Sequence, residues 1–216
     1  MALFGKRKQQ KLFELERSRL ARRMASEDVT VLGEQLTELH YETLTLELQG
    51  EIGDDYEQAL DAYERAKQHL RVSEGPDLVR ALQPILDEGR YRLARVLARR
   101  DARPLPQRLA PCFFNPQHGP SHTEVDWAPP GGVERRVPVC LSDVNRLERH
   151  TMPAVRTVRV GDHLVPWYEA DEAFGLRTGQ VDHRRVRELR NEHRAKGLQY
   201  SLDPTGINGS LGGTPL

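Results

Sequence analysis

The sequence predicts an α+β protein in which an N-terminal helical bundle precedes a small β module. Three observations support this. Leucines recur at helical spacing through the first hundred residues, proline and glycine separate short strand-like runs after residue 102, and both cysteines lie among those runs. We divide the chain into a basic helical arm (1–25), a bundle (26–101), a β module (102–174), a basic helix (175–200) and a flexible tail (201–216).

The composition excludes several classes of protein. Lys+Arg and Asp+Glu both number 32, 38% of residues are hydrophobic and the mean hydropathy is −0.66, which favours elongated helices around a thin core. No apolar run approaches the roughly 18 residues that cross a bilayer, and the first residues lack the apolar segment of a secretory signal. Two cysteines do not make a disulfide scaffold, so we expect a cytoplasmic protein.

The balanced total conceals segregated charge. Residues 1–23 hold eight Lys or Arg against two Glu, a net of +6, and residues 28–75 hold twelve acidic residues against three basic ones, a net of −9. Residues 177–196 hold seven basic and three acidic residues, a net of +4. This segregation suits charge pairing within or between molecules, and equally an external polyanion.

The helical half begins with residues 6–25, which are good helix formers without Gly or Pro. We expect a solvated helix leaning on the acidic bundle; the alternative is a basic arm for nucleic acid or anionic lipid. A second helix is predicted to begin at Ser26 or Asp28, because either side chain can cap backbone N–H groups. Its apolar seam has 4-3-4-3 spacing and comprises Leu32, Leu36, Leu39, Thr43 and Leu46.

The next two helices complete a predicted three-helix bundle with a leucine and tyrosine core. Residues 55–72 form an antiparallel hairpin with the preceding helix and place Tyr56 and Tyr63 on one face. The last helix runs to about Arg100, and we expect Pro84 to kink or split it because proline has no N–H group.

The predicted β module contains two hairpins separated by a short helix. Strands at 123–128 and 133–139 surround a Pro-Pro-Gly-Gly turn, and the helix is capped by Ser142 or Asp143. Strands at 155–160 and 163–168 follow, joined by a Gly-Asp pair suited to a tight turn. A charged helix over 182–196 then directs Val186 and Leu189 inward.

The order of turn, hairpin and helix is that of a treble-clef zinc finger. The candidate ligands are Cys112, His118, Cys140 and Asp143, with His122 as an alternative fourth donor. Zn²⁺ binds four N, S or O donors tetrahedrally and contributes folding energy to a module with few apolar residues.

The spacing of these candidates departs from standard zinc sites, because the first pair is C-x5-H and aspartate is an uncommon structural ligand. In the competing interpretation both cysteines are reduced core residues packed on Phe113 and Trp127, and Asp143 is only a helix cap. A Cys112–Cys140 disulfide is a further alternative that the cytosol disfavours.

Several segments together resemble a known family. They are Glu88-Gly89-Arg90-Tyr91, Pro104-Leu105-Pro106, Pro111 through Ser121, Val125-x-Trp127, Pro138-Val139-Cys140 and Val165-Pro166-Trp167. This pattern is similar to a family of uncharacterised bacterial proteins whose C-F-F-[ND]-P-x-H-G module follows a helical segment, sometimes in larger membrane-linked chains. The resemblance covers about residues 28–170 and implies the architecture without an activity. Some relatives carry a second cysteine where this chain has Asp143, which implies a metal site in those relatives.

The C-terminal tail resembles the Gly-Ser-Leu docking peptides that carry cargo proteins into encapsulin shells. Residues 206–212 read Gly-Ile-Asn-Gly-Ser-Leu-Gly, and the isolated apolar residues Leu202, Ile207 and Leu211 are candidate partner-docking anchors. A generic disordered tail is the alternative.

The sequence therefore favours a non-catalytic interaction or scaffold protein with a candidate Zn²⁺ site. The alternatives are a peripheral binder of nucleic acid or anionic membrane, an encapsulin-type cargo protein, and a thiol or metal-dependent enzyme. We find no nucleophile elbow, phosphate loop or dinucleotide fingerprint in the chain.

Overall fold

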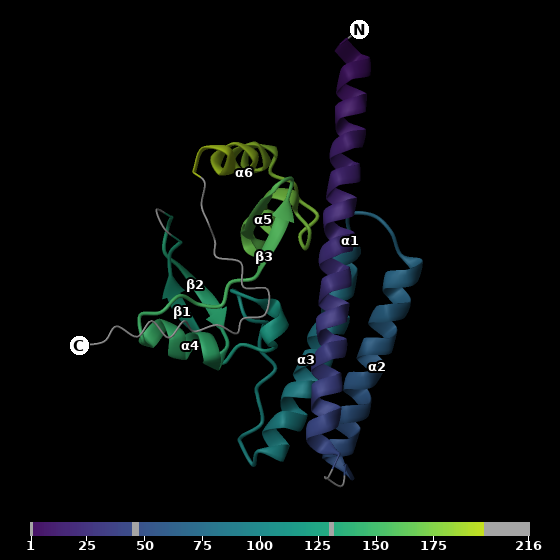
Figure 1. Ribbon diagram of the computed structural model, residues 1–216, viewed down its shortest axis with the longest axis vertical. Coiled ribbons are helices and arrows are strands. Elements are labelled where there is room, and N and C mark those ends of the chain that lie inside the picture. The colour runs from purple at the N-terminus through teal and green to yellow at the C-terminus, as the bar shows by residue number, and fades with distance from the viewer. Residues whose placement is uncertain (1, 45–47, 130–131, 197–216) are drawn as a thin grey trace, which may run out of the picture.

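A computed structural model describes residues 2–44, 48–129 and 132–196. These residues form six α-helices and two small antiparallel hairpins, which confirms the α+β fold with an N-terminal helical bundle. Figure 1 shows the helices α1 (Ala2–Thr43), α2 (Glu51–Val72) and α3 (Leu78–Arg100) on one side and the β module on the other. None of the helices in these ranges combines the length and the apolar character needed to span a bilayer.

The first helix is longer than the sequence predicted. We expected a new helix to begin at Ser26 or Asp28, but α1 continues through both residues without interruption. The prediction was wrong because Ser or Asp marks the start of a new helix only where its own backbone is not helical. The Arg-, Leu- and Ala-rich turns before Ser26 instead favour continuation.

In the bundle, α2 and α3 form an antiparallel pair against the second half of α1. The predicted seam of α1 is buried at Leu32, Leu36, Leu39 and Thr43, whereas Leu46 lies outside the described residues. The face that α2 buries consists mainly of alanines, at Ala59, Ala62 and Ala66, and Tyr63 is only partly buried. The core is therefore built from leucine and alanine rather than leucine and tyrosine. Pro84 does not split α3.

The second half of the chain contains the two predicted hairpins. Strands β1 (Thr123–Trp127) and β2 (Arg135–Val139) pair with Val125 opposite Val137. The helix α4 (Leu141–Glu148) follows, and then β3 (Thr157–Val160) pairs with β4 (His163–Pro166). Gly161, in the turn between β3 and β4, has a φ of 60°, the left-handed conformation that the Gly-Asp pair predicted.

Two helices close this half of the molecule. The sequence analysis missed α5 (Trp167–Phe174), whose first residues we had assigned to a strand, whereas α6 (His183–Lys196) was predicted and buries Val186 and Leu189. Trp167 and Tyr168 are both buried, and they continue the apolar run of β4 in the sequence, so the local pattern does not mark where the strand ends and α5 begins.

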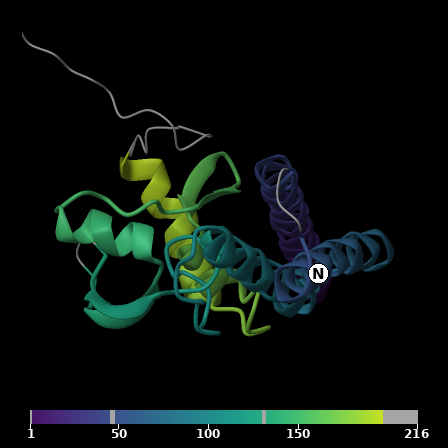
Figure 2. The same cartoon turned by 90° about the horizontal axis from the view of Figure 1, so that it is seen from below.

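The N-terminal half of α1 packs against these late elements and not against the acidic bundle alone. Leu20 and Met24 share a core with Trp167, Phe174 and Leu189. Phe13 stacks on Phe174, with ring centroids 5.9 Å apart. Figure 2, which views the molecule from below, shows the module and the bundle as neighbouring masses. One helix thus contributes to two cores, so Phe13, Leu20 and Met24 have a structural role.

Several arginines of the predicted basic arm have internal partners. Arg17 is 7% exposed and donates to the carbonyls of Phe174 at 2.7 Å and Gly175 at 3.0 Å, at the end of α5. Arg22 donates to the carbonyls of Leu70 and Ser73, at the end of α2. These guanidinium groups satisfy carbonyls that a helix end leaves without partners.

A buried carboxylate joins the bundle to the second half of the chain. Asp28, on α1, accepts hydrogen bonds from Arg156 Nη1 at 2.9 and 3.0 Å and from Gln117 Nε2 at 2.9 Å. Arg90, on α3, places its Nη2 atom 3.5 Å from the same carboxylate. The side chains of Asp28, Arg90 and Arg156 are only 10%, 4% and 6% exposed. Four separate segments therefore meet at one buried charge.

We expect Asp28→Asn to destabilise the protein by about 3–5 kcal/mol, because two buried guanidinium groups would lose their counter-charge. Urea unfolding measures this loss. Glu27→Gln is the matched control: Glu27 is 50% exposed and lies 3.4 Å from Arg156, so its loss should cost less than about 1 kcal/mol. Equal losses in the two variants would contradict the assigned role of Asp28.

A small cavity of roughly 30 Å³ lies beside this network, and Asp87 of α3 lines it together with Arg90 and Arg177. Burial raises the pKa of the Asp87 carboxyl to about 6, although the positive charge of Arg90 opposes this. The native carboxyl therefore binds a proton more tightly than the carboxyl of the unfolded chain, whose pKa is near its ordinary value of 3.8.

The free energy of unfolding should consequently fall as the pH rises from about 4 to about 6, through the deprotonation of Asp87. We expect Asp87→Asn to remove this fall and to be more stable than the parent at pH 7, by about 1–2 kcal/mol, since the carboxyl is partly exposed. Urea unfolding at several pH values measures both effects. Asp61→Asn, at an exposed position of α2, is the control and should leave the pH profile unchanged. A parental profile in Asp87→Asn would contradict the assignment.

Candidate metal centre

A tight turn brings the first two candidate ligands together. Pro111 and Pro120 form an isolated antiparallel bridge, and the Cys112 N–H group donates to the Gly119 carbonyl at 3.1 Å. Between them lies the short 3₁₀ helix η1 (Pro116–His118), whose N-terminus is capped by the Asn115 side chain. Gly119 reverses the chain with a φ of 85°, which suits glycine. Cys112 and His118 therefore lie at the two ends of one closed loop.

The second pair of ligands comes from the junction of β2 and α4. Cys140 directly follows β2 and is the N-cap residue of α4, and Asp143 lies in the first turn of that helix. Residues three apart share one face of a helix, so both side chains point back toward the turn. We had predicted Ser142 or Asp143 as the cap. That was wrong: no side chain caps α4, and the Asp143 carboxylate is directed into the cluster.

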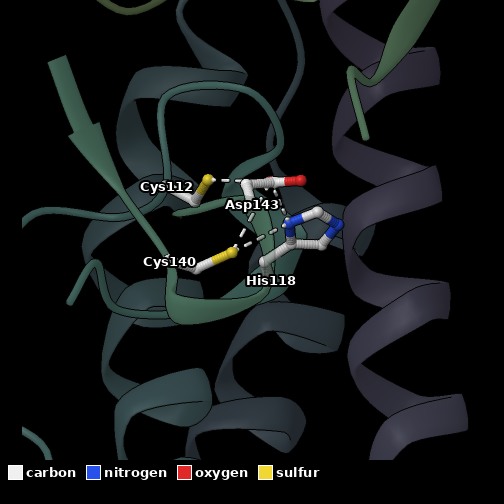
Figure 3. A group of neighbouring side chains, drawn as sticks. All are labelled: Cys112, His118, Cys140 and Asp143. Carbon is white, nitrogen blue, oxygen red and sulfur yellow. Dashed lines mark hydrogen bonds and ion pairs between the residues drawn. The ribbon is translucent and has the colours of Figure 1, made fainter. Parts of the chain in front are cut away.

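The four side chains converge on one point from the turn, the strand end and the helix (Figure 3). One ligand atom from each of Cys112, His118, Cys140 and Asp143 lies within 4.8 Å of the others. His118 Nδ1 is 3.1 Å from Asp143 Oδ2 and 3.4 Å from Cys140 Sγ, and both sulfur atoms are 3.5 Å from Asp143 Oδ2. These four residues lie close enough together to hold a metal ion.

The site is largely removed from solvent. Cys112 is fully buried, the Asp143 side chain has no exposed surface and Cys140 is 6% exposed, whereas the His118 side chain is 26% exposed. Both cysteines are free thiols, and no disulfide joins them. The cysteines do pack in a small core with Phe114, Val137 and Val139, as the competing interpretation expected, but their sulfur atoms face polar partners.

The electrostatics of the cluster favour a bound cation. The hydrogen bond with Cys140 lowers the pKa of the Cys112 thiol to about 5, against the effect of burial, and the pKa of the Cys140 thiol is raised because its proton is shared with that thiolate. Burial disfavours the charged His118 ring, yet hydrogen bonds with Asp143 and Cys112 raise its pKa to about 9. Burial is likewise outweighed at Asp143, where His118 and the Ala154 N–H group lower the carboxyl pKa to about 2.

At neutral pH these values leave one thiolate and one carboxylate against one imidazolium. The four side chains therefore carry a net negative charge in a buried position. Arg146, whose Nε atom lies 3.9 Å from Asp143 Oδ1 and whose side chain is half exposed, offsets it in part, and a bound cation would neutralise it.

A backbone group fixes the orientation of the carboxylate. The Ala154 N–H group donates to Asp143 Oδ1 at 2.8 Å, which leaves Oδ2 as the oxygen that faces the thiols and the imidazole. Such outer contacts orient metal ligands and tune their basicity. The sequence analysis missed this contact, and residues 149–156 carry no sequence signal that marks it.

The remaining candidates lie elsewhere. His122 has an exposed side chain, and its N–H group donates to the Val139 carbonyl, so the structure does not bring it into the cluster. Leu202, Ile207 and Leu211 lie outside the described residues.

Comparison of the chain with protein-family models, with curated proteins and with solved structures finds no match. The family resemblance and the encapsulin resemblance therefore stay predictions, and the function must be inferred from the site itself.

Proposed function

We propose that this protein is a non-catalytic scaffold or adaptor whose β module is held together by one Zn²⁺ ion. The observation that carries the proposal is the convergence of two thiols, one imidazole and one carboxylate within 4.8 Å. Sulfur and imidazole donors in a four-coordinate set favour zinc over magnesium or calcium, which prefer oxygen.

The donor count supports a structural role for the ion. Catalytic zinc sites use three protein ligands and leave the fourth position to water or substrate. Here the protein supplies four donors, and three of them are almost completely buried. The same burial argues against a thiol enzyme, because a cysteine nucleophile must reach its substrate.

The ion would also stabilise the contact between the module and the bundle. The module's own core is small, with five buried residues: Cys112, Phe114, Val137, Val139 and Cys140. Gln117, next to His118, donates to Asp28, and its carbonyl accepts from Gln35 Nε2 at 2.9 Å. Ligation of His118 would therefore hold η1 against α1, and this supports a rigid two-part platform that presents surfaces to a partner. The C-terminal tail remains a proposed docking segment on sequence grounds alone.

The purified protein should contain about one Zn²⁺ per chain. We expect Cys112→Ser and His118→Ala each to lose the metal and to lower the melting temperature, because a structural ion contributes folding energy. His122→Ala, which removes a nearby histidine outside the cluster, is the matched control and should retain both metal and stability. Elemental analysis and thermal unfolding measure these outcomes. Metal-free protein with unchanged stability would contradict the proposal.

Metal binding should release protons. Ligation requires the Cys140 thiol to ionise and the His118 imidazolium to become neutral, so about two protons should leave per ion at pH 7. Affinity should accordingly rise by about two orders of magnitude per pH unit near neutrality. Calorimetric titration of apo protein with Zn²⁺, in buffers of different ionisation enthalpy, counts the protons. His122→Ala should release the same number as the parent, and a parental release of only about one proton would remove His118 from the ligand set.

A further inference from the structure

The helix α1 has a second face that is largely exposed, although Arg22 on this face donates to carbonyls at the end of α2. Opposite its core-facing side chains runs a stripe at spacings of three and four residues along almost its whole length. The stripe comprises Lys8, Leu12, Leu15, Arg19, Arg22, Ser26, Thr30, Gly33, Thr37, Tyr41 and Leu44. All of these residues are exposed except Gly33, which is half-buried. Mean spacing near 3.6 keeps them on one straight line along the helix.

Large apolar side chains lie near both ends of this stripe. Leu12 and Leu15 are 56% and 46% exposed near one end, and Tyr41 and Leu44 are 69% and 62% exposed at the other. A groove of roughly 700 Å³ runs beside the second pair, lined by Gly33, Thr37 and Tyr41 of α1 and by Tyr63 of α2. Exposed apolar side chains gathered along a groove mark an interaction surface.

The charges flanking the stripe have opposite signs in its two halves. Lys8, Lys11 and Arg19 flank the leucines, whereas Glu34 and Glu38 line the tyrosine groove. Across the side chains that the structure describes, Lys8, Lys11, Glu34 and Glu38 enter no ion pair. The two halves are therefore complementary to each other, yet they lie on one straight helix and cannot meet within a single chain.

We propose that two copies of this chain pair through this face, with their α1 helices antiparallel and a twofold axis passing beside Ser26. Such an interface is isologous, so each contact occurs twice. When Ser26 faces its own copy, residues whose numbers sum to 52 lie level with each other, so Lys11 lies level with Tyr41, Leu15 with Thr37, and Arg22 with Thr30. In this register Leu12 and Leu15 reach the tyrosine groove, and Arg19 lies within one residue of the level of Glu34, so the basic half of one copy runs along the acidic half of the other.

The length and the centre of the stripe fit this arrangement. Lys8 and Leu44 lie 18 residues on either side of Ser26, so the paired segments match over about 54 Å of helix at a rise of 1.5 Å per residue. Small and medium residues occupy the centre, where Ser26 and Thr30 would allow the helices to approach closely. A second groove, of roughly 670 Å³ and lined by Arg19, Arg22 and Ser26, lies at this centre.

An anionic lipid surface fits the same face less well. Leu20 and Met24 of this half of α1 are already buried in the core, so among the side chains described from residue 6 onward, Leu12 and Leu15 are the leucines left for insertion. A lipid surface or a nucleic acid would also repel the acidic half of the stripe, which lies on the same line.

A charge swap tests the pairing. The variant Lys8→Glu/Lys11→Glu makes the stripe acidic at both ends, and Glu34→Lys/Glu38→Lys makes it basic at both ends. We expect sedimentation equilibrium to give the parent a mass of twice 24.7 kDa, and each variant alone to dimerise at least about 30-fold more weakly. An equimolar mixture of the two variants should recover the dimer, because opposite charges again face each other.

A crosslink tests the register. Ser26→Cys places a thiol on the twofold axis, so mild oxidation should yield a covalent dimer, whereas Gln10→Cys, exposed on another face of α1, should not. None of these substitutions touches the metal ligands, and each variant should keep the parental metal content. The test therefore stands apart from the proposed zinc site.

Three results would overturn the proposal. They are a parent that stays monomeric up to millimolar concentration, a dimer that survives both charge-reversal variants, and equal crosslinking at positions 10 and 26. Binding of monomeric protein to phosphatidylserine vesicles, abolished by Lys8→Glu/Lys11→Glu, would assign the face to lipid instead.

Discussion

The arrangement of this protein depends on the buried carboxylate of Asp28. Arg156 binds this carboxylate from the segment before β3, Gln117 binds it from η1, and Arg90 binds it from α3. A charge buried in this way is stable only while its partners are in place, so the network tolerates one relative position of bundle and module. Apolar packing alone would be less selective, because leucine and alanine surfaces can slide over one another at small cost. The ionic junction therefore specifies geometry, and the three apolar cores supply most of the stabilisation.

The metal cluster lies one residue away from this junction. His118 belongs to the cluster and Gln117 to the Asp28 network, and both lie in the three residues of η1. Two polar centres thus share a short, capped turn between a cysteine and a glycine. Occupation of the cluster by a metal ion would therefore act on the geometry of the Asp28 network through that turn, beside a module core of five buried residues.

Much of this fold can be predicted from the sequence, and so can the composition of the cluster. The helices, both hairpins and the ligand set follow from local patterns: leucine spacing, proline and glycine turns, and two cysteines with a histidine and an acid in a recognisable order. The differences arise where long-range contacts decide. Ser26 and Asp28 resemble caps, yet Asp28 is a counter-ion for Arg156, 128 residues further along the chain. Asp143 resembles a cap as well, and its true partners come from the turn at 112–118 and from Ala154.

The contact between Arg17 and the end of α5 affects the order in which the segments of the chain fold during synthesis. The first helix supplies Leu20 and Met24 to a core whose other members include Phe174 and Leu189, at least 150 positions later. On a ribosome, the bundle can assemble as soon as α3 has emerged, but Leu20 and Met24 stay uncovered until α5 and α6 have been made. These early residues of α1 therefore find their partners later than the rest of the helix does.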